Sequence, residues 1–307
     1  MINLASPTNG RRDAPREEAR KQLDSASYDG AAEDFGIFTE RLSAPLARAL
    51  LDVAAVGNGR RVLDIGTGTG LAAIQAAHRA GDGAVVGVDH SPGMLRVAET
   101  KARGVTNVTF RQMDAEALEF PDGAFDRVVS LFALLHFPEP LAAVREMHRV
   151  LAPGGRVAIA VGSGPNLVSW QGISHAARRV IDICEETRGR LLRAPQALRT
   201  FMREEGCAPP VEAAEHGHGS VAGFLEAASF SRVRSSWRGY RVSLDAHDFW
   251  RLQVTYGAPE RIFLGQLPPQ RAAALREDFQ RRCHAVQARG GRLLYQYGAM
   301  IFSAVKD

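Results

Sequence analysis

The chain has 307 residues, of which 45% are apolar and 23% charged, and its formal net charge is +4. At ~100–200 residues per domain, this length predicts one large domain or one domain with a substantial insertion. The composition excludes a disordered or fibrous protein, and no apolar run reaches the ~20 residues that span a bilayer. The basic residues are almost all arginine and are scattered among 34 acidic ones. The sequence therefore shows no cluster of basic residues of the kind that binds nucleic acid.

Residues 1–30 are polar and charged and lack the apolar stretch of a secretory signal. Cysteine occurs only at Cys184, Cys207 and Cys283, with no close pair. This usage favours a reducing compartment, with neither disulfides nor a zinc site. His216 and His218 have no third ligand nearby and indicate a loop rather than a metal site. We therefore expect a cytoplasmic protein with no metal, and the sequence leaves the oligomeric state open.

Residues 1–30 also lack apolar periodicity and are expected to form a mobile arm. From residue 31 to 56, apolar residues recur at steps of three and four, which predicts an amphipathic helical region interrupted near Pro45. Short apolar runs then alternate with helical patterns, which indicates βαβ units and a parallel sheet. The predicted strands are 61–65, 84–89, 105–111, 125–131 and 156–161, and the predicted helices are 71–80, 92–103 and 141–151.

After residue 161 the alternation stops. The stretch 163–220 shows helix and loop patterns, with helices at 166–186 and 195–205 and no evident strand. A short helix, a strand at 230–244, a helical stretch at 246–289 and a final strand at 292–305 follow. We therefore expect a core at 31–162 and a helical cap insertion at 163–229. The last two strands, with a second helical insertion, are expected at 230–307.

The first predicted strand runs directly into a loop with glycine at alternate positions, Gly66, Gly68 and Gly70, and a helix follows. Glycine lets ligand atoms approach the backbone, and doubly wound sheets bind ligands at the carboxyl ends of their strands. The third glycine comes one residue earlier than in the dinucleotide fingerprint. Asp64, two residues before the first glycine, would repel a pyrophosphate but suit an ammonium group. The loop therefore favours a nucleoside that carries an amino acid.

Carboxylates also follow the next two predicted strands. Asp89 ends the second strand, where a carboxylate can accept hydrogen bonds from both ribose hydroxyls. Asp114 ends the third strand and can accept from an exocyclic amine. Aspartate at a strand end often only caps the next helix. Acids at three successive strand ends nevertheless favour a ligand site.

At these residues the sequence resembles the class I S-adenosylmethionine-dependent methyltransferases, and most closely the small-molecule group that includes the quinone-biosynthesis C-methyltransferases. The resemblance covers residues 60–162 and rests on the segments 64–70, 88–95, 114–126 and 149–155. It implies a doubly wound, Rossmann-like α/β fold with a seven-stranded, mostly parallel sheet whose last strand is antiparallel. It also implies the cofactor S-adenosyl-L-methionine and methylation of an O, C or N atom of a small molecule. The aromatic residues of the capping stretches favour a partly apolar acceptor.

The resemblance also implies roles for single residues. The methionine portion of the cofactor would be surrounded by Asp64, Gly66, Thr67, Gly68, Thr69 and Gly70. Asp89 would hold the ribose, and His90 and Met94 would lie near the sugar and the adenine. Asp114 and Ala115 would bind the edge of the adenine. Leu131 would lie near the sulfonium, and Tyr28 would cover the cofactor.

His136 follows the fourth predicted strand beside the expected methyl position, and the near-neutral pKa of histidine suits a general base. A histidine that only shapes the pocket is the other interpretation. Trp170, His175, Trp250 and Tyr256 could line the acceptor pocket or serve as packing residues. Two other functions stay open. One is an NAD(P)-dependent oxidoreductase on a similar fold, and the other is a protein that binds the cofactor without methylating or that catalyses another reaction.

Overall fold

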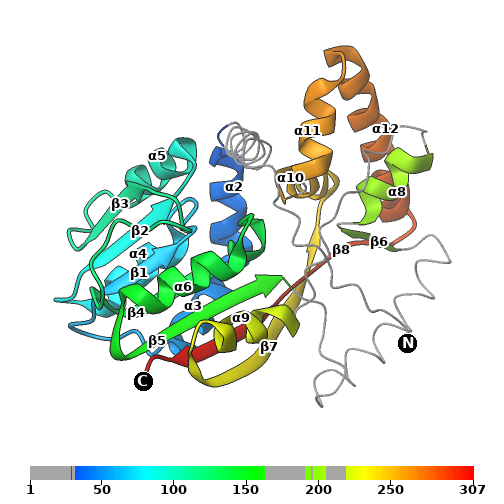
Figure 1. Ribbon diagram of the computed structural model, residues 1–307. Helices are drawn as coiled ribbons and strands as arrows, with labels where there is room; N and C mark the ends of the chain where they lie inside the picture. The colour runs from blue at the N-terminus through cyan, green and yellow to red at the C-terminus, as the bar shows by residue number, and fades with distance from the viewer. Residues whose placement is uncertain (1–28, 30–31, 163–190, 195, 205–218, 257) are drawn as a thin grey trace, which may run out of the picture.

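The structure is a computed structural model that describes residue 29 and residues 32–162, 191–194, 196–204, 219–256 and 258–307 (Figure 1). The predicted arm, apart from Asp29, and the predicted helix at 166–186 lie outside the described residues. So do His216 and His218, together with most of the predicted cap insertion.

A helical region precedes the sheet, as predicted. It consists of α2 (Ala32–Phe38), the π-helix η1 (Thr39–Ser43) and α3 (Ala44–Val53). Pro45 has no N–H to donate to the carbonyl of Arg41, so the regular hydrogen-bond ladder of an α-helix cannot continue through this point. The predicted interruption near Pro45 is confirmed, and it takes the form of a π-helical turn.

Five parallel strands form the centre of the molecule, and helices connect them. The strands are β1 (Val62–Ile65), β2 (Val85–Asp89), β3 (Val108–Gln112), β4 (Phe125–Leu131) and β5 (Leu151–Gly162); the helices are α4 (Leu71–Ala80), α5 (Pro92–Lys101), the 3₁₀-helix η2 (Leu134–His136) and α6 (Pro140–Val150). The sheet begins in the order β3-β2-β1-β4-β5. This order reverses direction between β1 and β4, which is where doubly wound sheets bind ligands.

The last strand, β8 (Arg292–Val305), pairs antiparallel with β5 and with β7 (Ser231–Leu244), which confirms the predicted antiparallel end of the sheet. A further strand, β6 (Leu191–Ala194), pairs with the beginning of β8. The sheet therefore has eight strands. The expectation of seven strands, with none in residues 163–220, was wrong. Because β6 has only four residues and pairs with a strand far along the chain, it leaves no periodic pattern in the sequence.

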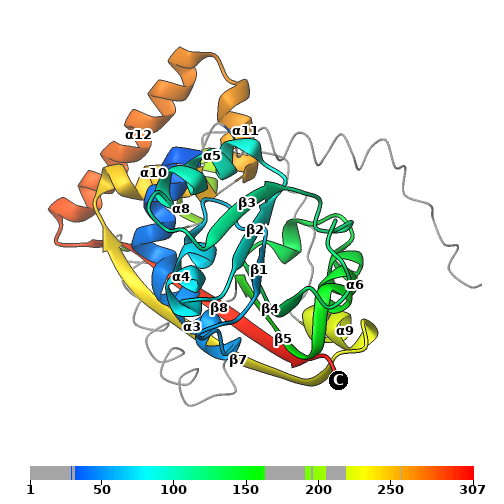
Figure 2. The ribbon, with the colours of Figure 1, turned by 90° about the vertical axis from the view of Figure 1, so that its left-hand side faces the viewer.

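Helices cover both faces of the sheet. In Figure 2, α3, α4 and α5 lie on one side, and α6 and α9 (Gly219–Ala227) lie on the other. The neighbouring residues Val128 and Val129 of β4 belong to the two different hydrophobic clusters, one on each face. This division follows from the alternation of side chains along a strand.

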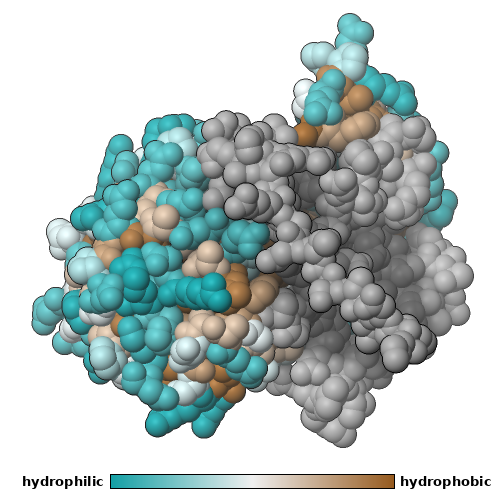
Figure 3. Space-filling view, viewed as in Figure 1, coloured by the Kyte–Doolittle hydropathy of each residue, from teal (hydrophilic) through white to brown (hydrophobic). Residues whose placement is uncertain are grey.

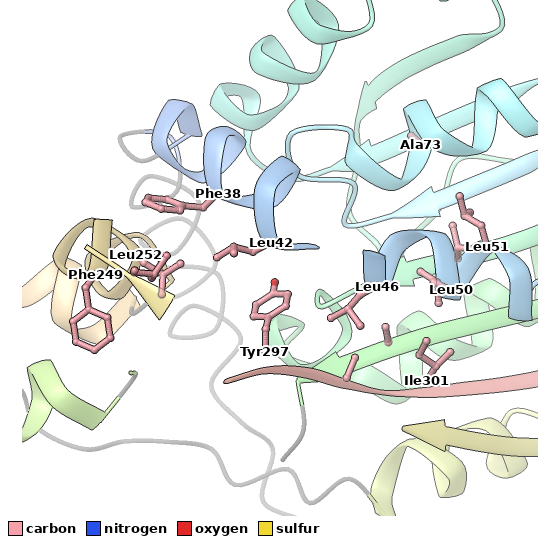
Figure 4. Packing of buried hydrophobic residues seen from close by; sticks show 14 of the residues in the cluster. Phe38, Leu42, Leu46, Leu50, Leu51, Ala73, Phe249, Leu252, Tyr297 and Ile301 are labelled. Carbon is pink, nitrogen blue, oxygen red and sulfur yellow. The ribbon is translucent and has the colours of Figure 1, made fainter. Parts of the chain in front are cut away.

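A second group of helices lies beside β6 and the adjoining parts of β7 and β8. It contains α8 (Gln196–Glu204), α10 (Ala246–Tyr256), α11 (Ala258–Gln266) and α12 (Pro269–Ala288), and we call it the second lobe. Three helices thus occupy the predicted helical stretch 246–289. Phe38 and Leu42 of the N-terminal helices belong to the same hydrophobic cluster as Phe249 and Leu252 of α10 (Figure 4). One continuous core therefore joins the second lobe to the sheet.

The surface seen in Figure 3 is mostly hydrophilic over the sheet and its helices, with small, separate hydrophobic areas. Separate apolar residues of this kind are normal on a folded protein. In the part of the chain that the structure describes, no helix combines the length and the apolar character needed to cross a membrane.

Candidate functional site

The predicted acids gather at one edge of the sheet, because the carboxyl ends of parallel strands lie on the same side. Asp64 is the penultimate residue of β1, Asp89 is the last residue of β2, and Asp114 follows the end of β3. β1 lies between β2 and β4 in the sheet, so Leu131 at the end of β4 borders the same region. The structure thus assembles residues that the sequence separates by more than sixty positions.

The glycine loop owes its shape to left-handed backbone at Gly66, Gly68 and Gly70, whose φ angles are +68°, +54° and +82°. A Cβ atom on Gly66 would lie 2.1 Å from the Cβ of Ala133, so this glycine lets the loop pack against the turn after β4. A Cβ atom on Gly68 would meet nothing within 4 Å. Gly68 therefore faces open space, as a ligand that approaches the backbone requires.

Asp64 is only 1% exposed, and its two oxygens have different surroundings. Oδ2 accepts a hydrogen bond from the hydroxyl of Thr67 at 2.7 Å, whereas Oδ1 has no hydrogen-bond partner among the described residues. Burial raises the pKa of this carboxyl to about 7. A buried carboxylate is stable when a cation pairs with it, so Asp64 has the position and the free oxygen to bind an ammonium group.

Asp89 joins the glycine loop to the turn after β2. Its carboxylate accepts hydrogen bonds from the N–H of Gly68 at 2.8 Å and from the N–H of Ser91 at 3.0 Å. Burial raises its pKa, although the residue keeps some exposure. A carboxylate has about four acceptor positions, so Asp89 can still accept from two hydroxyl groups.

The turn after Asp89 continues into α5. The Ser91 side chain caps this helix by accepting from the N–H of Met94 at 3.1 Å. His90 is exposed and Met94 is 3% exposed. The predicted neighbours of the sugar and adenine thus differ in character, one polar and one apolar.

Asp29 is a residue of this region that the sequence analysis missed. Its Oδ1 accepts from the hydroxyl of Ser91 at 2.6 Å and from the N–H of Gly93 at 2.8 Å. A Cβ atom on Gly93 would lie 2.6 Å from that oxygen, so the glycine makes room for Asp29. The only sign of this contact in the sequence was Gly93, whose missing side chain leaves space for another group. Tyr28, the predicted covering residue, lies outside the described residues.

The predicted adenine edge lies after β3. Asp114 is partly exposed, and its Oδ1 accepts from the N–H of Glu116 at 2.9 Å, while Ala115 is 8% exposed. Arg149 supports the following turn by donating to the carbonyls of Leu118 and Phe120, both at 2.7 Å. This arginine begins the last of the segments on which the family resemblance rests.

The chain takes an uncommon conformation directly after β4. Phe132 has a φ of +63°, a left-handed value that is strained for a bulky side chain. Its N–H donates to the carbonyl of Ala160 at 2.8 Å, which holds the strained backbone in place. His136, the predicted base, is exposed at the end of η2, the helix that follows. The assignment of His136 as a base stays a prediction.

Trp250, for which the sequence leaves both an acceptor-lining and a packing role, lies in the core of the second lobe. The rings of Phe201, Phe249 and Trp250 lie 5.5, 6.2 and 5.5 Å from the ring of Phe279. Trp170, His175 and the side chain of Tyr256 lie outside the described part. Within the described residues, Asp245, His247 and Asp248 form one group with metal-ligand spacing. Asp245 caps α10 and Asp248 pairs with Arg41, so both carboxylates already have structural partners.

The comparisons with known proteins agree with this geometry. Residues 62–155 match the family model described as methyltransferase domain. The chain is 45% identical over 114 residues to the demethylmenaquinone methyltransferase of Thermus thermophilus, a match that covers 36% of this chain and 51% of that protein. It is 36% identical over 137 residues to the aklanonic acid methyltransferase DauC of a Streptomyces species, with coverages of 44% and 59%. The chain thus spans about half the length of the curated relatives that it matches.

The fold has solved counterparts. The crystal structure of the YcgJ protein from Bacillus subtilis is similar with a TM-score of 0.52 and 21% identity, over 85% of this chain and 97% of that chain. This likeness concerns the fold. Residues 62–155 are thus similar to the methyltransferase domains of class I. Within that class, the sequence is similar to the quinone-biosynthesis methyltransferases.

Proposed function

We propose that the protein is an S-adenosylmethionine-dependent methyltransferase that acts on an O, C or N atom of a small, partly apolar metabolite. The observation that carries this proposal is Asp64, a buried carboxylate with one oxygen lacking a described partner, next to a glycine loop that faces open space at Gly68. A pyrophosphate would be repelled there, whereas the α-ammonium group of the cofactor's methionine portion would be attracted.

The residues at the sheet edge fit the rest of the cofactor. In the proposal Asp89 accepts from the ribose hydroxyls, and Asp114 accepts from the exocyclic amine of the adenine. The methionine portion lies along the loop formed by Gly66, Thr67, Gly68, Thr69 and Gly70, and the remaining proposed contacts come from Tyr28, His90, Met94, Ala115 and Leu131. The spare acceptor positions of Asp89 and the exposure of Asp114 support these assignments.

The bound cofactor supplies an electrophilic methyl group on a sulfonium. The protein's own part is to hold the acceptor in line with that methyl group and to exclude water. Where the acceptor needs to lose a proton, His136 is the proposed base. Its place on η2, just after β4, supports this role.

The acceptor is proposed to lie against the aromatic residues near the end of β4. The ring of Phe132 is 5.5 Å from that of Tyr297, which in turn is 5.2 Å from Tyr295 and 6.0 Å from Tyr240. Ala299 pairs with Gly162, the last residue of β5, so Tyr295 and Tyr297 lie beyond the carboxyl end of that strand. Phe132, Tyr240 and Tyr295 are partly exposed, and such rings suit a flat acceptor. By their names, the two curated relatives act on demethylmenaquinone and on aklanonic acid.

Binding and turnover test the proposal separately. Isothermal titration with S-adenosylhomocysteine and with NAD should give affinity for the former only. Detectable NAD affinity without affinity for S-adenosylhomocysteine would show an oxidoreductase instead. Incubation with methyl-labelled cofactor and a panel of hydroxylated naphthalenes and polyketides should then transfer label. A protein that binds the cofactor but labels neither this panel nor a metabolite extract would fit the non-methylating alternative.

The remaining predictions from the sequence belong to the same proposal. We place the protein in the cytoplasm, with a small-molecule acceptor and without nucleic acid or a metal ion. We also retain the division into a core at 31–162, a cap insertion at 163–229 and a final segment at 230–307 with its own helical insertion.

A further inference from the structure

The glycine loop is contacted from outside by the π-helix η1. The hydroxyl oxygen of Thr39, in η1, lies 3.2 Å from the hydroxyl oxygen of Thr69 in the loop. The two residues are only 7% and 2% exposed. A hydrogen bond between two buried hydroxyl groups cannot be replaced by water when one partner is removed.

The direction of this hydrogen bond follows from a second contact. The Thr39 hydroxyl donates to the carbonyl of Gly36 at 3.1 Å. A hydroxyl group has one hydrogen, so Thr39 accepts from Thr69. The hydrogen of the Thr69 side chain is therefore directed toward η1. Thr69 would therefore contact the cofactor through its backbone, while its side chain holds the glycine loop against η1.

The carbonyl of Gly36, in α2, links η1 to α5, the helix that begins at the proposed ribose turn. Lys101, at the end of α5, donates to this carbonyl at 2.9 Å and pairs with Glu40 at 3.0 Å. A Cβ atom on Gly36 would lie 2.9 Å from the Lys101 ammonium nitrogen. Thr39 and Lys101 thus meet at one oxygen, and η1 is attached to both the glycine loop and α5.

Strand β8 and the second lobe both contact the other side of this helical segment. The Ser43 and Tyr297 hydroxyl oxygens are 2.5 Å apart, and Figure 4 shows Tyr297 extending from β8 toward the N-terminal helices. Arg251 of α10 pairs with Asp34, and its guanidinium lies 5.5 Å from the centre of the Phe38 ring. The segment that contacts the glycine loop therefore has its position set partly by the second lobe.

We propose that Thr39 is a positioning residue for the methyltransferase reaction. Through Thr69, it holds the glycine loop in its binding conformation and connects that loop to the second lobe. This inference rests on the proposed function, because it concerns the same cofactor. It assigns a role to a residue outside every motif of the methyltransferase domain.

The test compares Thr39→Val, which removes the hydroxyl, with Thr39→Ser, which keeps it. Isothermal titration with S-adenosylhomocysteine on the full chain should show a Kd weakened about 5- to 30-fold in Thr39→Val, the range expected for one lost buried hydrogen bond. The Kd of Thr39→Ser should stay within about threefold of wild type. Thr100→Val, on the exposed end of α5, is the matched control and should change nothing.

Hydrogen exchange adds a readout that general destabilisation would not give. S-adenosylhomocysteine should slow exchange in the loop 66–70 and also in α10 of the second lobe, and the α10 effect should be lost in Thr39→Val. If Thr39→Val fails to fold, Thr69→Val removes the same hydrogen bond from the loop and should weaken binding alike.

Two results would overturn the inference. One is an unchanged Kd in a folded Thr39→Val, whether or not its Tm falls. The other is slower exchange confined to residues 62–155 in the wild type. Absence of any S-adenosylhomocysteine binding by the wild type is a different outcome, because it contradicts the proposed function itself.

Discussion

The N–H of Gly68 donates to Oδ2 of Asp89 at 2.8 Å, so the first strand's loop and the second strand's last residue form one unit. The same carboxylate receives the N–H of Ser91. A ligand that engages Asp89 therefore contacts a group that already orders both loops.

Replacing Asp89 with alanine should weaken cofactor binding by about 1–3 kcal/mol, because ribose hydroxyls and two backbone N–H groups lose their acceptor. Titration with S-adenosylhomocysteine measures this change. Asp126→Ala is the control, since Asp126 pairs with Arg61 away from the proposed site. Equal affinity in a folded Asp89→Ala would show that the ribose lies elsewhere.

The affinity for S-adenosylhomocysteine should fall as the pH drops below about 7, the pKa to which burial raises Asp64. The ammonium group of the ligand binds the ionised form of Asp64. Below this pH, Asp64 must therefore lose a proton before the ligand can bind, and the Kd should rise by up to about tenfold per pH unit. Titrations across this range should show a plateau above the pKa. In Asp64→Asn the slope should disappear, and a persistent slope would assign the titration to another group.

The same carboxyl should reduce stability in the absence of cofactor. Because the pKa in the folded state lies above the ordinary aspartate value of 3.8, the folded state binds more protons than the unfolded state between these two pH values. The stability therefore falls as the pH rises through about 7. Asp64→Asn should therefore have a higher Tm than wild type at about pH 8 while binding the cofactor more weakly. A lower Tm in the variant would show that the buried charge of Asp64 does not lower the stability of the folded protein.

Phe132→Gly should destabilise the protein less than Phe132→Ala, by about 1 kcal/mol, although it removes one more carbon. Glycine adopts the φ of +63° without strain, whereas alanine does not. Chemical denaturation measures the difference. At Phe137, where φ is −72°, the order of the two substitutions should reverse. The same order at both positions would argue against strain at Phe132.

His136→Gln should bind S-adenosylhomocysteine like wild type and lower turnover by ~10²–10⁴, the usual contribution of a positioned base. Because the His136 side chain is exposed, the substitution should leave the fold intact. The acid limb of the wild-type pH–rate profile should vanish in the variant. Near-wild-type turnover at a saturating concentration of a labelled acceptor would remove His136 from the mechanism.

Local patterns predicted much of this molecule. The bounds of α4, β4 and β8 agree with the sequence analysis, because each has a strong periodic pattern with clear ends. The alternate glycines and the acids Asp64 and Asp89 marked the edge of the sheet where the structure places them. What the sequence could not supply depends on partners far along the chain. β6 exists through its pairing with β8, and the contacts of Asp29 with Ser91 and of Thr39 with Thr69 cross sixty-two and thirty positions.

The length and position of β8 have a consequence for how the protein folds. Its fourteen residues pair with β5 near the centre of the sheet, with β6 beside the second lobe, and with β7 along most of their length. During synthesis, these three strands leave the ribosome before residues 292–305, the segment that pairs with each of them in the described structure. We therefore expect the centre of the sheet and the strands beside the second lobe to complete their folding in a shared late step, because the pairing of β8 joins parts of the chain that are far apart in the sequence.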